Sequence, residues 1–390
     1  MTGVQTCALP ISNSSSPAPI FGLGSSNNRP FGYSYPALPA RPLNPQGGIT
    51  GLQFNIGGID PNLVSPVTYT YSVAADHELG RRLVGSLIYT GSNSRYLLSG
   101  GGQVFSVSYG QDINVQQGDL IAHNSLIPTR LNTSFGQVNY TQNDRESNYN
   151  AFIVAFRGRF KRAFFNTSYT RSASKDDTQV YPTYINPHQY YAPSLWDAPN
   201  RFSLAWNYEF PGYNDGRGFV GKVATGWQLS GTTIWQAGNP FTVSTNAAFL
   251  PLKNASGQFI GYAPGSGDFN ADGDTLDYPN VASYSYKTGR QNYLHGVFTS
   301  TNFVQPAFGN EGNERYGAFR APGFQQWDTA LLKNTPIMES VAFQLRFEFF
   351  NVFNHPNLTN MDVNLPDGNF GKATGQAVPR FIQIGGNLTF

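Results

Sequence analysis

The sequence predicts an all-β protein, specifically a transmembrane antiparallel β-barrel, and three observations support this fold class. Apolar and polar residues alternate with period two over segments of roughly 9–13 residues. Such segments exceed the roughly 5–6 residues of an average soluble strand and match the roughly 9–11 that a tilted strand needs to cross a membrane. Phe, Tyr and Trp make up 15% of the chain and gather on the apolar faces. The connections between the segments alternate between short and long.

The composition excludes several other classes. The 390 residues carry 12% charged side chains, about half the roughly 25% of soluble domains. A helical bundle would be richer in Ala, Glu, Lys and Leu, and a disordered chain poorer in aromatic residues. The sequence contains no run of about 18 apolar residues, so no membrane helix is predicted. A net charge of +2 predicts no nucleic-acid partner. A soluble β-sandwich remains the alternative.

The first twelve residues, MTGVQTCALPIS, read like the translation of a sequencing adapter. They lack the basic region and the apolar stretch of a signal peptide. We therefore expect that residues 1–12, which include the single cysteine Cys7, are not native and that the natural chain is truncated. Residues 13–66 are rich in Ser, Asn, Pro and Gly and predict an irregular segment with one strand near 52–56.

Residues 67–390 carry the predicted strands, and the C-terminus shows the pattern most clearly. Ile382, Ile384, Leu388 and Phe390 share one face of the last strand, opposite the polar Gln383. The alternation predicts roughly ten to twelve strands, although residues 94–133 give no clear placement. The other segments with this pattern are 67–79, 83–89, 148–160, 163–171, 201–210, 223–235 and 341–353.

The lengths of the connections predict which end of the strands is periplasmic and which is extracellular. Short turns are expected at 79–82, 160–162, 211–218 and 335–340, and long segments at 174–200, 238–322 and 354–379. Barrels of the bacterial outer membrane have short periplasmic turns and long extracellular loops. A soluble domain rarely contains a connection of 85 residues such as 238–322. The sequence therefore predicts a protein of the bacterial outer membrane, in contact with its lipid.

Several motifs resemble the late barrel of TonB-dependent outer-membrane receptors, and more narrowly their Oar-like branch, common in acidobacterial genomes. The resemblance runs in order over residues 67–390. The motifs are SNYNA (147–151), SYTRS (168–172), GWQLSG (226–231), GNPFTV (238–243), RAPGF (320–324) and RFEFFNVFNHPN (346–357).

The resemblance implies a plugged barrel of about 22 strands, of which this chain would be the C-terminal part. It also implies an N-terminal region, missing here, through which TonB acts on the plug. The full protein would bind a ligand at its extracellular loops and import it through the barrel. The alternative is an Oar-like barrel for adhesion or binding without active transport. Ligand identity is left open by the sequence.

Residues 268–277 form a candidate calcium loop. Carboxylates and one amide at alternate positions suit a hard cation, and Gly273 allows a sharp turn. Pro279 takes the position where an EF-hand has its bidentate Glu, so the alternative is a polar turn without metal. No other cofactor is expected. The predicted ligands are Asp268, Asn270, Asp272, Asp274 and Asp277.

Aromatic residues supply two further predictions. Those in the predicted outer loop could stack on a ligand, or simply pack the loop; they are Tyr181, Tyr184, Tyr190, Tyr191 and Trp196. Four tryptophans in the strands are expected in the girdles at the membrane boundaries; they are Trp206, Trp227, Trp235 and Trp327.

The last strand is expected to carry an assembly signal. Phe390 at the C-terminus and Leu388 on the same face look like the signal read by the barrel-assembly machinery. We expect no enzymatic activity, because no nucleophile–base pair, phosphate-binding loop or metalloprotease motif is present.

Overall fold

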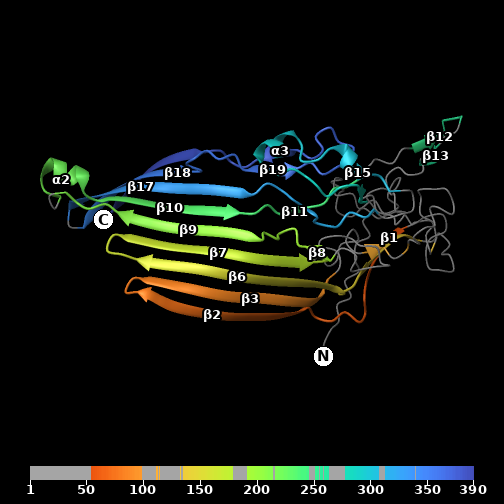
Figure 1. Cartoon of the computed structure of the whole chain (residues 1–390), viewed down its shortest axis with the longest axis horizontal. Coiled ribbons are helices and arrows are strands. Elements are labelled where there is room, and N and C mark those ends of the chain that lie inside the picture. The colour runs from red at the N-terminus through yellow and green to blue at the C-terminus, as the bar shows by residue number, and fades with distance from the viewer. Residues whose placement is uncertain are drawn as a thin grey trace, which may run out of the picture.

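The computed structural model describes residues 54–98, 111–112, 114, 132, 135–178, 191–213, 216–245, 251–253, 255–257, 259–262, 277–306, 312–338 and 340–390. Its main feature is one ten-stranded sheet in which each long strand pairs antiparallel with the next long strand along the chain (Figure 1). The short β8 (Ala192–Pro193) extends the end of β7. The nine long strands are β2 (Val67–Gly80), β3 (Leu83–Leu97), β6 (Arg145–Arg159), β7 (Ala163–Asp176), β9 (Asn200–Glu209), β10 (Trp227–Gln236), β17 (Phe324–Met338), β18 (Val341–Phe350) and β21 (Phe381–Thr389).

The sheet is open, and its edges are β2 and β21. The long strands have 9 to 15 residues, as a membrane-crossing strand requires. An antiparallel barrel fold is therefore confirmed in its strands and their order, although the described strands do not close on themselves.

The connections alternate as the sequence predicts. The β2–β3, β6–β7 and β17–β18 turns lie at the end of the sheet that also holds the C-terminus (Figure 1). The longer segments between β3 and β6, β7 and β9, β10 and β17, and β18 and β21 lie at the other end. We call these the short-turn end and the long-loop end.

One predicted strand is shorter than the alternation suggested. Val223, expected in a strand over 223–235, lies in the helix α2 (Gly218–Ala224) at the short-turn end. Gly226 takes a φ of +88°, and its carbonyl accepts the Asn334 amide, so β10 begins only at Trp227. An apolar residue at the right spacing does not extend a strand past such a turn.

The smaller elements belong to the long-loop end. β1 (Phe54–Ile59), which overlaps the strand expected near 52–56, pairs parallel with β5 (Phe135–Thr141), and β4 (Gln111–Asp112) pairs with β5. Neither α2 nor α3 (Arg290–His295) approaches the length and apolarity of a membrane-spanning helix, nor does any other described helix. The remaining pieces are the short pairs β11–β16 (Pro240–Phe241, Phe319–Arg320), β12–β13 (Pro251–Lys253, Phe259–Tyr262), β14–β15 (Asn280–Val281, Phe303–Val304) and β19–β20 (Leu358–Met361, Ala373–Gln376), and the 3-10 helix η2 (Ser300–Asn302).

The strand register sorts the side chains of the sheet into two faces. Residues paired across strands point to the same side, so Val73, Tyr89, Phe152 and Arg171 belong to one face. This aromatic face carries side chains that are exposed although apolar, for example Val73 at 73% and Ile384 at 66%. The opposite, polar face carries Ser, Thr, Asn and Gln, together with the Arg346–Glu348 ion pair at 2.8 Å.

Four aromatic rings on the aromatic face lie over glycines of the neighbouring strand. The direct cross-strand pairs are Tyr71–Gly91, Phe156–Gly85, Phe165–Gly158 and Trp206–Gly231. In each pair a β-carbon built on the glycine would meet the ring. The ring covers backbone that the glycine leaves bare, a known way to stabilise a sheet.

These pairs predict a specific packing defect. Gly158→Ala should destabilise the chain by about 1–3 kcal/mol, because the new methyl group displaces the Phe165 ring and disturbs its stacking on Phe160. Denaturant unfolding in detergent micelles measures this loss. Gly385→Ala is the matched control, since a β-carbon there meets no atom within 4 Å. Equal losses for the two variants would contradict the prediction.

Candidate functional site

The aromatic face has one boundary on the side of the long-loop end, which we call the upper boundary. It is marked by tyrosine hydroxyl groups that point toward the long-loop end. Tyr71 and Tyr89 both donate to Asn150 Oδ1, at 2.6 and 2.9 Å. Tyr169 donates to Asn200 Oδ1 at 2.7 Å, and Arg171 donates to the same oxygen at 3.1 Å. A ring with an apolar body and a bonded polar tip is the side chain favoured where lipid meets water.

The other boundary of the aromatic face, on the side of the short-turn end, is the lower boundary. It lies near the start of β10. Lys333 belongs to the aromatic face, and its ammonium group donates to the carbonyls of Lys222, at 2.9 Å, and Thr225. The indole of Trp227 donates to Val223 O at 2.8 Å, and Lys333 lies 5.9 Å from the centre of that ring. A long cationic side chain that reaches back to polar groups keeps its charge out of an apolar layer.

The predicted girdle tryptophans fall at different levels. Trp235 and Trp327 pack against each other near the long-loop end, with ring centres 6.0 Å apart. Trp227 lies at the lower boundary, and Trp206 lies between the two levels, over Gly231. Trp227 and Trp235 are eight residues apart on β10, or about 26 Å along the strand. Because the strands of an outer-membrane barrel tilt by about 35–45°, this spacing covers about 20 Å of an apolar band that is about 25 Å tall, and the two indoles lie near its opposite boundaries.

The long-loop end contains a hydrophobic core of its own, which we call the loop core. It joins the β10–β17 and β18–β21 connections, because Phe370 from the second connection stacks on Phe298 from the first. Phe319 is fully buried at its centre. The buried members are Val243, Tyr293, Val297, Phe298, Phe303, Phe319 and Phe370.

A buried carboxyl group lies beside this core. Glu314 accepts the Val243 amide on Oε1 at 2.7 Å, whereas its Oε2 finds no partner among the described residues. Burial raises the pKa of Glu314 to about 8, although the Val243 hydrogen bond opposes the shift. The group is therefore mostly protonated at neutral pH, and the uncharged form is the one that this site tolerates.

A cavity of about 600 Å³ opens on the polar face at the long-loop end, and we call it the mouth pocket. Its floor carries side chains of four neighbouring strands, β6, β7, β9 and β10, and is rich in hydroxyl groups. Its rim carries Trp196 and Asp197 of the β7–β9 connection. The residues of the floor include Tyr149, Thr170, Ser172, Ser174, Arg201, Ser203 and Gln236.

The segment that carries Trp196 is held firmly to β7. The Ser174 amide donates to Asp197 Oδ1 at 2.7 Å, and Ser172 donates its amide to Pro199 O at 3.0 Å and its hydroxyl to Ala198 O at 3.1 Å. Arg320 forms a 2.5 Å ion pair with Asp197. Trp196 itself is 76% exposed. An exposed indole on an anchored segment is ready to stack on a ligand without first being ordered.

The other predicted loop residues are described only in part. Tyr181, Tyr184 and Tyr190 lie outside the described residues. Tyr191 lines a neighbouring cavity of about 930 Å³ with Lys175 and Arg315. The hydroxyl-rich floor of the mouth pocket was not predicted as a site, although Thr170, Ser172 and Ser174 already alternate in the sequence.

The calcium prediction cannot be followed through the structure. Asp268, Asn270, Asp272 and Asp274 lie outside the described residues. Asp277 is buried, and its carbonyl accepts the Thr245 amide at 3.0 Å. Within the described ranges no group of three His, Cys, Asp or Glu side chains is placed to hold a metal ion.

The predicted assembly residues lie at the short-turn end. Leu388 is on the aromatic face, paired with Phe343, and is 51% exposed. Phe390 follows the last strand and is 93% exposed. Both side chains are free to be contacted from the open edge of β21.

An antiparallel sheet of membrane-crossing length, with an aromatic face bounded at two levels, defines an outer-membrane β-barrel protein. The chain belongs to the family described as "Outer membrane beta barrel domain", whose sequence profile matches residues 6–383. It is therefore a protein of the bacterial outer membrane, in which the aromatic face meets lipid and the polar face lines the lumen.

Solved structures that resemble the chain are outer-membrane transporters and receptors. The transporter YddB from Escherichia coli has a TM-score of 0.43 and 11% identity, over 84% of this chain and 33% of that one. The unliganded ferric citrate transporter FecA has 0.37 and 9%, over 83% and 31%. The ferripyoverdine receptor of Pseudomonas aeruginosa has 0.35 and 13%, over 83% and 27%. The chain thus spans a third or less of each, and no curated protein sequence matches it.

Proposed function

We propose that the chain is the C-terminal part of the barrel of a TonB-dependent outer-membrane receptor of the Oar-like branch. In this proposal the long-loop end is extracellular and the short-turn end periplasmic. A ligand binds at the mouth pocket and is imported through the barrel when TonB acts on a plug. Phe390 and Leu388 are the residues that the barrel-assembly machinery contacts.

The observation that carries the proposal is the mouth pocket. It lies on the lumen side of the sheet at the loop end, and it combines an anchored, exposed indole with a hydroxyl-rich floor. Ligand sites in proteins commonly combine an aromatic surface with a few placed polar groups. The motif resemblance over residues 67–390 supports the same proposal.

The test is ligand binding by the full chain in detergent micelles. One probe represents each ligand class: ferric citrate, ferripyoverdine, maltohexaose and a hexapeptide. Trp196→Ala should weaken binding of the recognised probe about tenfold or more, since aromatic side chains that a ligand covers contribute most of the binding energy. Trp196→Phe should retain most of the affinity, and Tyr213→Ala, an exposed aromatic residue at the other end, should change nothing.

Two outcomes count against the proposal. Binding that Trp196→Ala leaves unchanged would remove the mouth pocket as the ligand site. For the recognised probe, accumulation by cells that express the complete receptor with its plug should stop when an uncoupler removes the inner-membrane proton gradient. Accumulation that persists would favour an adhesion or binding barrel, a function that the folded loop core would also suit.

A further inference from the structure

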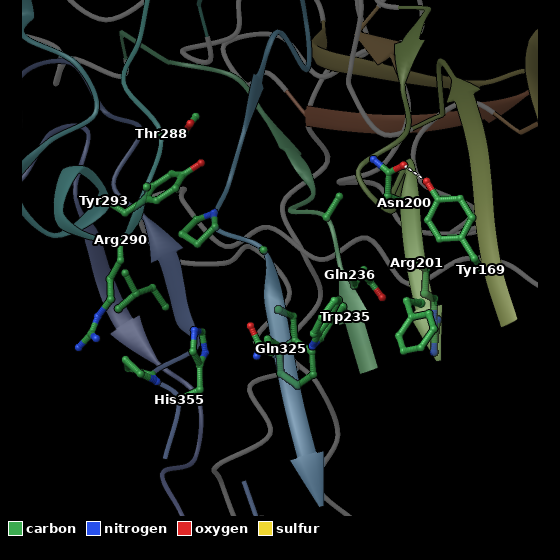
Figure 2. Close-up of a pocket in the computed structure, with 18 residues that line it drawn as sticks. Tyr169, Asn200, Arg201, Trp235, Gln236, Thr288, Arg290, Tyr293, Gln325 and His355 are labelled. Atoms are coloured by element: carbon green, nitrogen blue, oxygen red, sulfur yellow. Dashed lines mark hydrogen bonds between the residues drawn. The ribbon is translucent and has the colours of Figure 1, made fainter. Parts of the chain in front are cut away.

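The described lining of the mouth pocket includes one arginine that the protein leaves free. Arg201 is exposed on the polar face of β9, paired with Thr170 of β7 on one side and Gln236 of β10 on the other, and all three line the pocket. Figure 2 shows a second cavity of about 600 Å³, which Arg201 and Gln236 also line. Within the described part of the chain the Arg201 side chain forms no ion pair and no hydrogen bond. Its guanidinium group is therefore available to a ligand.

The acidic group of the mouth pocket, in contrast, is already paired. Asp197 accepts the Ser174 amide on Oδ1 at 2.7 Å and the Arg320 guanidinium group on Oδ2 at 2.5 Å. No other Asp or Glu is among the described residues that line the mouth pocket. The described lining of the second cavity adds Arg290 and also contains no Asp or Glu. This end of the polar face thus carries an uncompensated positive charge, which favours an anionic ligand.

Several hydroxyl groups of the pocket floor are free in the same way. Tyr149 and Ser174 are paired across β6 and β7, and Thr170 lies on the same face of β7. The hydroxyl groups of these three side chains have no hydrogen-bond partner among the described residues. A hydroxyl group both donates and accepts hydrogen bonds, so this floor suits a ligand that carries many hydroxyl groups itself.

The rim adds a flat apolar surface. Trp196 is 76% exposed, although its segment is anchored to β7. An indole ring offers a large apolar face, on which the apolar face of a sugar ring can stack. An aromatic face, free hydroxyl groups and an unpaired cation therefore line one cavity of about 600 Å³, a volume within the range of about 300–1,000 Å³ that is usual for ligand pockets.

We propose that the ligand of the mouth pocket is an acidic oligosaccharide, a chain of sugar rings that bear carboxylate groups. A sugar ring stacks on Trp196, and its carboxylate group pairs with Arg201 through charge-assisted hydrogen bonds. The hydroxyl groups of the ring exchange hydrogen bonds with Tyr149, Thr170 and Ser174. This inference rests on the proposed function, because it names the ligand class of the same site.

The experiment measures binding to the full chain in detergent micelles by isothermal titration calorimetry. The probes are hexagalacturonate, the same hexamer with its carboxylates methyl-esterified, maltohexaose and ferric citrate. The unmodified chain should bind hexagalacturonate about tenfold or more tightly than the methyl ester, which has the same rings without the charge. Maltohexaose, which lacks carboxylates, and ferric citrate, which lacks sugar rings, should both bind more weakly than hexagalacturonate. The preference for the acid over its ester should shrink between about 0.1 and 1 M salt, because salt screens exposed charges.

Variants separate the contribution of the charge from that of the stacking. Arg201→Gln should weaken hexagalacturonate about tenfold and leave the methyl ester unchanged, so that the preference for the acid disappears. Arg201→Lys, which keeps the charge without the planar guanidinium group, should keep part of the preference. Trp196→Ala should weaken both forms by the same factor. Arg157→Gln is the matched control, since Arg157 is an exposed arginine on the polar face of β6 toward the short-turn end.

The acid and its ester decide the question without any variant. Equal or tighter binding of the ester by the unmodified chain would overturn the inference, and so would an absence of measurable binding of hexagalacturonate. An Arg201→Gln variant that keeps the preference would also overturn it. Tighter binding of ferric citrate would replace the oligosaccharide with a metal chelate.

Failure of this inference differs from failure of the proposed function. If Trp196→Ala weakens a probe that has no preference for sugar carboxylates, the mouth pocket remains the ligand site and only the ligand class is wrong. If Trp196→Ala weakens no probe, the mouth pocket is not the ligand site, and both proposals fail.

Discussion

Phe319→Ala should unfold the loop core while leaving the strands of the sheet intact. Phe319 is fully buried, and its ring contacts Phe298 at 4.6 Å, Tyr286 at 5.2 Å and Phe241 at 5.8 Å between centres. Removing a buried phenylalanine side chain costs about 3–5 kcal/mol. Because loops open independently of strands, this loss is expected to appear locally.

Hydrogen exchange of the full chain measures the effect. Amides of α3, β14 and β15 should lose protection by an amount that corresponds to about 3–5 kcal/mol, whereas β6 and β7 should not change. Phe219→Ala is the matched control, because Phe219 in α2 is 82% exposed. A uniform loss of protection across loops and strands would show that the loop core is not a separate unit.

Glu314→Gln should abolish a pH dependence of the same loop core. The folded pKa of Glu314, about 8, lies above its ordinary value of 4.5, so the folded state keeps a proton that the unfolded state releases. Stability of the loop core is therefore highest below about pH 4.5 and falls as pH rises towards 8, by about 1.4 kcal/mol per pH unit at most. A glutamine has no proton to lose, and the slope should vanish.

Exchange protection factors at pH 5, 6.5 and 8, each corrected for the intrinsic exchange rate, measure the slope over about three pH units. Glu209→Gln serves as control, since Glu209 is an exposed carboxylate at the short-turn end. The assignment fails if the pH slope of the loop core survives in Glu314→Gln.

The long strands could be predicted because each repeats a two-residue pattern that one buried or lipid-facing surface imposes. In β21 and β18 the alternation alone places Ile384 and Phe347 on one face, and the register pairs them directly. The helix α2 shows the limit of this pattern. Val223 has the spacing of a strand residue, but the turn at Gly226 sets the start of the strand, and Val223 lies in the helix. Periodicity identifies a face, and local backbone geometry decides where the face stops.

The loop core could not be predicted in the same way. Val243, Phe298, Phe319 and Phe370 come from segments without periodicity, and they meet only after two connections fold against each other. The mouth pocket has the same origin: Trp196 was singled out as a loop aromatic residue, but its position depends on the Asp197–Arg320 ion pair across 123 residues of sequence. Contacts between distant loops leave no local signal.

The glycine–ring pairs of the aromatic face constrain how this surface can change over generations. At Phe165–Gly158 and Tyr71–Gly91 the ring occupies the space that a larger residue would need. A substitution at the glycine is harmful while the ring is present, and becomes acceptable once the ring has been replaced by a smaller side chain. The two positions of each pair are therefore expected to change together, with the ring replaced before the glycine. An engineer who varies these positions one at a time would miss the tolerated combinations.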